Sequence, residues 1–330
     1  ADGRFVAFVS QSTNLVTGVS GQQVYLRDRQ TGQITLVSKN SSGVTSNGLV
    51  NSSPAISKDG QFIAFVSNGT NLVTGVTGQQ IYLHDRVAGT TRLISQDNGV
   101  TPVPGDGTSV TPAISADGRY IAFASVSTHL GAAGGNQQIY IHDRLTGATG
   151  TISLISKDSG GTAGNGNSST PSVSGDGRYV AFASLATNLV AGVSGQQIYL
   201  HDRNTGVNGT NSLISHDNNG TSAQGNGVSS LPSISSDGQV VAFVSLATNL
   251  LSPAPAVAGQ QIYSHDRSTG VNGATSLVSK DNSVVPVAGS GLSNTPSANS
   301  DGSFVAFYSQ SANLVARSVA LSDIYIRALP

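Results

Sequence analysis

Residues 54–86 read PAISKDGQFIAFVSNGTNLVTGVTGQQIYLHDR, and close variants of this stretch recur along the whole chain. Their most regular mark is an Asp-Gly pair, which returns every 57 to 64 residues. A fixed period of this kind indicates a repeat protein, in which each copy forms one structural unit. Six Asp residues mark the copies: Asp2, Asp59, Asp117, Asp176, Asp237 and Asp301.

Each complete copy contains four short runs rich in Ile, Val, Phe, Tyr and Thr, the residues that favour β-strands. In the quoted copy and its continuation these runs are residues 54–57, 61–67, 81–84 and 92–95. In the second run, apolar residues occupy both alternating sets of positions. That pattern predicts a strand buried on both faces, lying between sheets and not on a solvated surface.

The residues between the runs predict turns. In Asp59-Gly60 the glycine can take the positive φ of a tight hairpin, and Pro54 stands where a strand begins and a missing N–H is tolerated. No segment has a helical period with caps, so almost no helix is expected. Six antiparallel sheets that are apolar on both faces can bury them only by a radial arrangement. We therefore predict an all-β fold, a six-bladed β-propeller of four-stranded antiparallel blades, as a single domain over residues 1–330 with blades starting near residues 2, 54, 112, 171, 232 and 296.

The strand count predicts an incomplete ring junction between blades 1 and 6 in this chain. The chain starts at the second strand of blade 1 and stops after the third strand of blade 6. One interpretation is that the sequence is part of a longer chain. The other is that a strand from a neighbouring chain or domain completes the junction, because unpaired strand edges accept added strands.

Composition excludes some partners. The net charge is −1 and only 10% of residues are charged, so no basic field exists to hold a nucleic acid. No apolar run is long enough to cross a bilayer, and no membrane insertion is expected. Cys, Met and Trp are absent, and all 17 acidic residues are Asp. A chain rich in Gly, Ser, Thr and Asn without oxidisable sulfur suits an extracellular or cell-surface protein.

Most acidic residues have a repeated role. Of the 17 Asp, six lie in the Asp-Gly turns, five in Asp-Arg pairs and four after the fourth strands, which leaves Asp106 and Asp323. Only these two Asp residues are left to form a pair of catalytic carboxylates with different pKa values. We therefore predict no enzyme activity, no catalytic residue and no cofactor. Calcium is the one metal that the sequence leaves as a candidate, and Asp323 is its one candidate ligand. No D-x-D-x-D-G run is present.

Four histidines and four tyrosines recur at fixed positions of the third strand. Either they form a repeated binding pocket, or the histidines are polar side chains that bond between blades. Blades 1 and 6 carry Arg27 and Arg327 at the histidine position, which favours the second reading, since a cation cannot be a metal ligand. We interpret His129 and His216 as surface variation. The binding candidates are His84, His142, His201, His265, Tyr82, Tyr140, Tyr199 and Tyr263.

The repeated pattern P-x-x-S-x-D-G-x-x-[IV]-A-F-x-S…[IV]-Y-x-x-D-R-x-T-G…L-[IV]-S resembles the WD40-like (PD40) repeats of TolB-type six-bladed propellers, over essentially the whole chain. This resemblance implies a bacterial protein, for which the periplasm is the alternative to an extracellular or cell-surface location. The chain departs from that pattern in two ways. The usual Pro before Asp-Gly is replaced, as by Lys58 and Ala116. Where similar secreted bacterial repeats carry Asp and Asn before the third strand, this chain mostly has Gln-Gln.

Three functions stay open on these grounds. The first is a non-catalytic scaffold of a secreted or cell-surface protein that mediates protein–protein interaction or self-assembly, with strand addition at the blade 1/blade 6 junction as one route. The second is a carbohydrate-binding, lectin-like propeller whose repeated polar residues contact glycans. The third is an accessory propeller domain of a larger secreted enzyme, because the repeats resemble propellers fitted to some peptidases. The fold alone does not choose among them.

Overall fold

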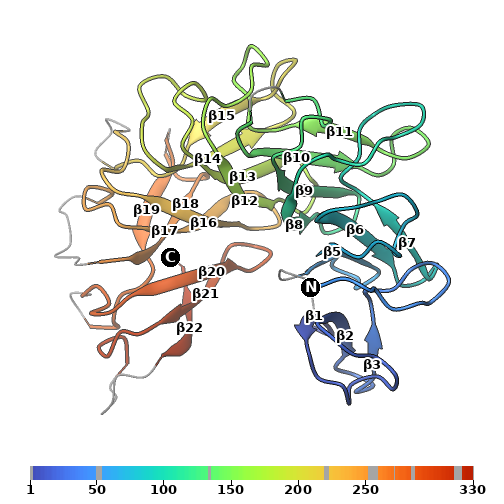
Figure 1. The fold of residues 1–330 in the computed structure, drawn as a ribbon. Coiled ribbons are helices and arrows are strands. Elements are labelled where there is room, and N and C mark those ends of the chain that lie inside the picture. The colour runs from blue at the N-terminus through green and yellow to red at the C-terminus, as the bar shows by residue number, and fades with distance from the viewer. Residues whose placement is uncertain are drawn as a thin grey trace. The chain divides into compact units, whose positions relative to one another are not determined.

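The structure, a computed structural model, consists of twisted antiparallel sheets with no helix in its described residues (Figure 1). The residues it describes are 3–49, 54–132, 135–218, 223–251, 259–270, 272–283, 287–315 and 322–329. No helix in these ranges is long and apolar enough to cross a membrane. They contain six sheets, one for each predicted blade, so the prediction of a six-bladed β-propeller is confirmed. The predicted start near residue 2 lies outside the described residues.

The chain divides into two compact units, Ala1–Ser156 and Lys157–Pro330, each with three blades. In the first unit, blade 1 has the strand order β1-β2-β3, blade 2 β4-β5-β6-β7 and blade 3 β8-β9-β10-β11. The strands are β1 (Phe5–Ser10), β2 (Gln23–Asp28), β3 (Ile34–Leu36), β4 (Ala55–Ile56), β5 (Phe62–Ser67), β6 (Gln80–Asp85), β7 (Thr90–Leu93), β8 (Ser109–Ile114), β9 (Tyr120–Ser125), β10 (Gln138–Asp143) and β11 (Thr151–Leu154).

In the second unit, blade 4 has the order β12-β13-β14-β15, blade 5 β16-β17-β18-β19 and blade 6 β20-β21-β22. Among the described residues blades 1 and 6 thus have three strands each, as the strand count predicts. The strands are β12 (Ser168–Val173), β13 (Tyr179–Ser184), β14 (Gln197–Asp202), β15 (Thr210–Leu213), β16 (Ser229–Ile234), β17 (Val240–Ser245), β18 (Gln261–Asp266), β19 (Ala274–Leu277), β20 (Ser293–Ala298), β21 (Phe304–Ser309) and β22 (Asp323–Ala328).

The second strand of each inner blade is buried on both faces, as its apolar pattern predicts. Every residue of β5, β13 and β17 is buried. Within each blade a Phe of the second strand stacks on the Tyr opposite it in the third strand, with ring centroids 5.7 to 6.0 Å apart. Such offset aromatic pairs add to the stabilisation that burial of their area gives. The sheet faces then pack on neighbouring blades, as in the cluster that joins Ile198 and Leu200 to Val241 and Phe243.

The Asp-Gly turns also join neighbouring blades. Gly60 has a φ of 70°, which confirms the predicted turn geometry. Space adds a second reason for glycine here. A Cβ on Gly118 would lie 2.3 Å from the Phe62 ring of the preceding blade, and Arg144 covers the same ring at 3.9 Å. In blades 2, 3 and 5 the turn therefore closes over an aromatic side chain of the blade before it, and in blade 6 it closes over Val240.

The first strands of the later blades begin before the proline that marks them in the sequence. β8 starts at Ser109, whose hydroxyl donates to Ser125 Oγ at 2.9 Å, three residues ahead of Pro112. The pairing then shifts register between Val110 and Ala113, a β-bulge. The bulge holds Thr111 at a φ of 50°, in the left-handed region that β-branched residues rarely adopt.

The second Gln of each Gln-Gln pair is buried, and its side-chain amide hydrogen-bonds other parts of the chain. Gln197 donates from Nε2 to the Gly225 carbonyl at 2.8 Å and accepts from Ser215 Oγ at 2.6 Å. Ser215 Oγ in turn accepts from the Ile198 N–H at 2.9 Å. A neutral amide both donates and accepts, which a carboxylate at this position could not do. The equivalent residues are Gln23, Gln80, Gln138 and Gln261, all buried.

We expect Gln197→Leu to lower the free energy of unfolding by about 2–4 kcal/mol, because it leaves the buried Ser215 hydroxyl and Gly225 carbonyl without their partner. Urea unfolding at pH 7 measures the change. The control is Gln33→Leu, at an exposed side chain, which should change stability by less than about 0.5 kcal/mol. Equal urea midpoints for the two variants would contradict the assignment.

Candidate functional site

The four predicted tyrosines lie inside their blades. Each is fully buried, and burial raises the pKa of Tyr82, Tyr140, Tyr199 and Tyr263 to about 12. Three of the phenol groups donate to backbone carbonyls of the loop between the second and third strands. These bonds are Tyr82 to Gly69 at 3.3 Å, Tyr199 to Ala186 at 3.1 Å and Tyr263 to Ala247 at 3.3 Å.

The four predicted histidines are also buried, and the hydrogen bonds of His84 and His201 lead to neighbouring loops. His84 Nδ1 lies 2.9 Å from Thr91 Oγ1, which donates to the Lys39 carbonyl at 2.5 Å. His201 Nδ1 lies 2.9 Å from Asn211 Oδ1, and Asn211 Nδ2 donates to the Lys157 carbonyl at 2.6 Å. The structure thus places His84 and His201 in links between a third strand, its fourth strand and a loop. In the described residues neither ring nitrogen of His142 has a hydrogen-bond partner.

Burial keeps these histidines neutral at pH 7. It lowers the pKa of His84, His142 and His265 to about 4, and it also lowers the pKa of His201. Nearby cations act in the same direction, Lys39 on His84 and Arg92 on His142. Neutral imidazoles in the interior can serve as hydrogen-bonding groups but carry no charge for a ligand.

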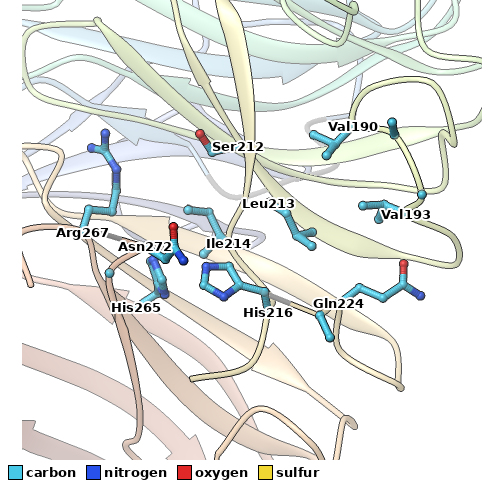
Figure 2. Close-up of a pocket in the computed structure, with 14 residues that line it drawn as sticks. Val190, Val193, Ser212, Leu213, Ile214, His216, Gln224, His265, Arg267 and Asn272 are labelled. Atoms are coloured by element: carbon cyan, nitrogen blue, oxygen red, sulfur yellow. The ribbon is translucent and has the colours of Figure 1, made fainter. Parts of the chain in front are cut away.

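A cavity of about 530 Å³ opens beside one of them, within the second unit (Figure 2). It lies between blades 4 and 5, along β15. His216 forms part of its lining, and the His216 and His265 rings meet edge to face with centroids 4.9 Å apart. The interpretation of His216 as surface variation is wrong, because its side chain is buried. The sequence alone could not place it beside His265, since the two residues belong to different blades.

The cavity has an apolar wall and a polar side. Figure 2 shows Val190, Val193 and Leu213 along one part of the lining, and His216, His265 and Asn272 along another. No carboxylate belongs to this lining. His216 Nδ1 donates to the Asp217 carbonyl at 2.8 Å, and His265 Nδ1 lies 3.0 Å from Thr275 Oγ1. In the described residues neither histidine hydrogen-bonds a serine.

The two Asp residues outside the repeated positions have different surroundings. Asp106 accepts from the Ser127 and Thr128 hydroxyls at 2.7 and 2.6 Å and closes its own loop. Asp323 is the first residue of β22, opposite Ser309, at the position that a buried Gln occupies in the other blades. Among the described residues, no group of three or more His or Asp side chains is arranged to hold a metal ion.

We predict that only glycine fits at position 209, because the imidazole ring of His201 lies directly against its Cα. Its φ is 77°, and an added Cβ would lie 2.2 Å from His201 Nε2. Gly206 in the same turn has a φ of 62° but open space around it. Gly206→Ala should therefore cost about 1 kcal/mol for backbone strain alone. Gly209→Ala should cost at least about 2 kcal/mol more, because a buried ring must move. Equal thermal midpoints for the two variants would show that His201 is not packed there.

Stability should fall as the pH is lowered from 7 to 5. Histidine in the unfolded chain has a pKa of about 6.5 and binds protons in this range, while folded His265, with its pKa lowered to about 4, does not. The stabilisation is therefore complete above about pH 6.5 and is lost as the pH falls toward 4; at pH 5 the loss is about 2 kcal/mol for this histidine. Urea unfolding of wild type and of His265→Gln at pH 7 and pH 5 measures the part of this loss that comes from His265. The control is His129→Gln, at an exposed histidine. If His265→Gln loses as much unfolding free energy between pH 7 and pH 5 as wild type does, His265 is not the source of the pH dependence.

Comparison with known proteins identifies the fold. No protein-family model matches the chain, and no curated protein matches its sequence. Among solved structures, it is similar to TolB from Acinetobacter baumannii, with 19% identity, a TM-score of 0.52 and coverage of 94% of this chain and 61% of that one. The chain thus spans less than two thirds of that TolB chain.

Two further structures show the range of similar proteins. The β-propeller domain of the Trilobed protease from Pyrococcus furiosus has 11% identity and a TM-score of 0.56, over 99% of this chain and 80% of that one. An oligogalacturonate lyase in complex with manganese has 14% identity and a TM-score of 0.53, over 94% and 73%. At these identities the likeness concerns the fold alone. The chain therefore has a TolB-like six-bladed β-propeller fold.

Proposed function

We propose that the chain is a non-catalytic propeller scaffold of a secreted or cell-surface protein, which associates with other protein chains, copies of itself included, through one face of blade 6. The observation that carries the proposal is the exposure of large apolar side chains on that face. Apolar patches of this kind commonly mark sites of protein association.

Within the second unit, blade 5 covers one face of blade 6, and no other blade of that unit covers the opposite face. Val305, Phe307 and Tyr325 pack into a cluster with Ala242, Val244 and Ile262 of blade 5. On the opposite face, Ile326 pairs across the strands with Ala306, and Ile324 with Tyr308. There the exposed fraction is 71% for Ile324 and 73% for Ile326, and Phe304 is 46% exposed.

The same positions are covered in blade 5. Val240 corresponds to Phe304 and is 7% exposed, and Ile262 corresponds to Ile324 and is 0% exposed. Burying one such side chain contributes about 1.5–3 kcal/mol, so a partner that covers the face gains a substantial free energy. In the sheet order β20-β21-β22, β22 is also an edge, where a partner strand can add.

The roles of the acidic residues support a scaffold over an enzyme. Asp28, Asp143 and Asp202 each form a 2.7 Å ion pair with an arginine of the same blade. Asp59, Asp117 and Asp176 each accept from a neighbouring serine hydroxyl at 2.6 Å within the Asp-Gly turn. Carboxylates held in such bonds stabilise turns and are poorly placed to transfer protons.

Sedimentation velocity over a range of protein concentrations tests the proposal. Wild type should form larger species as concentration rises, and Ile326→Asn should weaken the association at least tenfold without lowering the thermal midpoint at low concentration. The control is Val207→Asn, at a fully exposed valine of blade 4, which should associate like wild type. A wild type that stays monomeric, combined with a lower thermal midpoint for Ile326→Asn, would contradict the proposal, because the chain itself would then cover the face.

Two observations favour other functions. The cavity lined by His216 and Asn272 has the mixed apolar and polar lining that sugar-binding pockets use, which supports the lectin-like alternative. The likeness to the propeller domain of a protease supports an accessory domain of a larger enzyme. Glycan binding that is lost on His216→Ala would favour the first, and hydrolase activity that requires additional sequence would favour the second.

A further inference from the structure

A second cavity of about 530 Å³ lies between blades 5 and 6, within the second unit. The side chains of Asp237, Asp266 and Asp301 line it, together with Ser264 and Gln239. Leu329 and Val240 supply an apolar part of its wall. The lining contains three carboxylates and no Lys, Arg or His.

In blades 1, 3 and 4 an arginine occupies this region. Arg178 donates to both carboxylate oxygens of Asp202, from Nε at 2.9 Å and from Nη2 at 2.7 Å. The pairs Arg4–Asp28 and Arg119–Asp143 have the same two-point geometry. In blade 2 an amide replaces the arginine, and Gln61 Nε2 still donates to Asp85, at 3.1 and 3.3 Å.

Blade 5 lacks this pair. Gln239 takes the position of Arg178, but its exposed side chain does not hydrogen-bond Asp266. In the described part of the chain, Asp266 accepts only from the Ser268 N–H and hydroxyl, at 2.8 and 2.6 Å, and both bonds go to Oδ1. The second carboxylate oxygen, which faces an arginine in three other blades, has no bonded partner there.

A second cation is also replaced. Arg267 covers the Tyr179 ring at 4.2 Å and donates to the Gly238 carbonyl, and its charge contributes to the lowered pKa of Asp202 in the preceding blade. Leu329 stands at the corresponding position in blade 6. Arg327 bonds the Asp281 carbonyl at 2.9 Å instead. Asp266 therefore lacks both arginines that accompany Asp202.

Ser264 is an independent sign of a ligand. Its side chain is 4% exposed and lines the cavity, and its hydroxyl makes no hydrogen bond within the described residues. The hydroxyl is not among the buried polar atoms that lack a partner, so it reaches the solvent of the cavity and is open to a polar ligand. The other five blades have an apolar residue at this position: Leu26, Leu83, Ile141, Leu200 and Ile326. A polar, smaller side chain therefore stands where the cavity opens.

We propose that this cavity binds a guanidinium group supplied from outside the chain, as a free arginine derivative or as an arginine side chain of a partner protein. Asp266 pairs with it through both oxygens, as Asp202 does with Arg178, and the Ser264 hydroxyl gains a polar partner. The planar fork of a guanidinium matches a carboxylate at two points, which a compact ammonium cannot do. The carboxylates are too dispersed for a metal, since no group of them in the described residues could hold one ion.

Calorimetric titration with arginine methyl ester and lysine methyl ester tests the site. The esters lack the carboxylate that three Asp side chains would repel. Wild type should bind the arginine ester at least tenfold more tightly than the lysine ester. Asp266→Asn should weaken binding of the arginine ester at least tenfold, with the fold checked by circular dichroism. Equal affinity for the two esters, or unchanged affinity in Asp266→Asn, would overturn the proposal.

Gln239→Arg tests the same site without removing a residue that the fold uses. The new arginine should pair with Asp266, raise the thermal midpoint and abolish binding of the ester. Gln33→Arg adds the same charge at an exposed position of blade 1 and should leave binding unchanged. A short peptide with a central arginine, compared with its lysine counterpart, identifies a protein source if it binds at least tenfold more tightly than the ester. If neither the ester nor the peptide binds to wild type, the proposal is wrong.

Discussion

The structure depends on strands that are apolar on both faces. In blades 2, 4 and 5 every residue of the second strand is buried, and the Phe–Tyr pair beside it presents large aromatic surfaces. A single sheet of this kind would expose two apolar faces to water, at a cost in free energy that its own hydrogen bonds do not offset. Each blade is therefore stable only beside another. Blade 6, with Ile324 and Ile326 exposed, is where this requirement is unmet in the second unit.

The polar residues in the interior follow from the same packing. Sheets that bury both faces also bury their loop carbonyls and strand ends, and those groups need partners. Gln197 with Ser215, and His201 with Asn211, supply them. The repeated polar residues thus support the fold, and positions that break the repeat become more informative about function. His216, Ser264, Gln239 and Leu329 are such positions, and each lines a cavity.

The repeat made much of the fold predictable. The pattern of apolar residues and the turn residues located the strands of blade 2 to within about two residues. This was possible because the burial of a strand follows from the spacing of apolar residues in its own sequence. The bulge at Thr111 was not predictable, since a left-handed Thr before Pro contradicts local preference. The role of Gln197 and the burial of His216 were missed for another reason. Both depend on contacts between side chains of separate strands, loops or blades. The repeated sequence pattern does not show which of these distant side chains are in contact.

Hydrogen–deuterium exchange in dilute solution tests the central claim most directly. If burial between neighbouring sheets protects each blade, the amides of β17 and β18 should exchange slowly, because blades 4 and 6 cover blade 5. The amides of β22 should exchange much faster, since no blade of the second unit covers the face of blade 6 that carries Ile324 and Ile326. Equal protection of β18 and β22 in a monomeric sample would contradict the account.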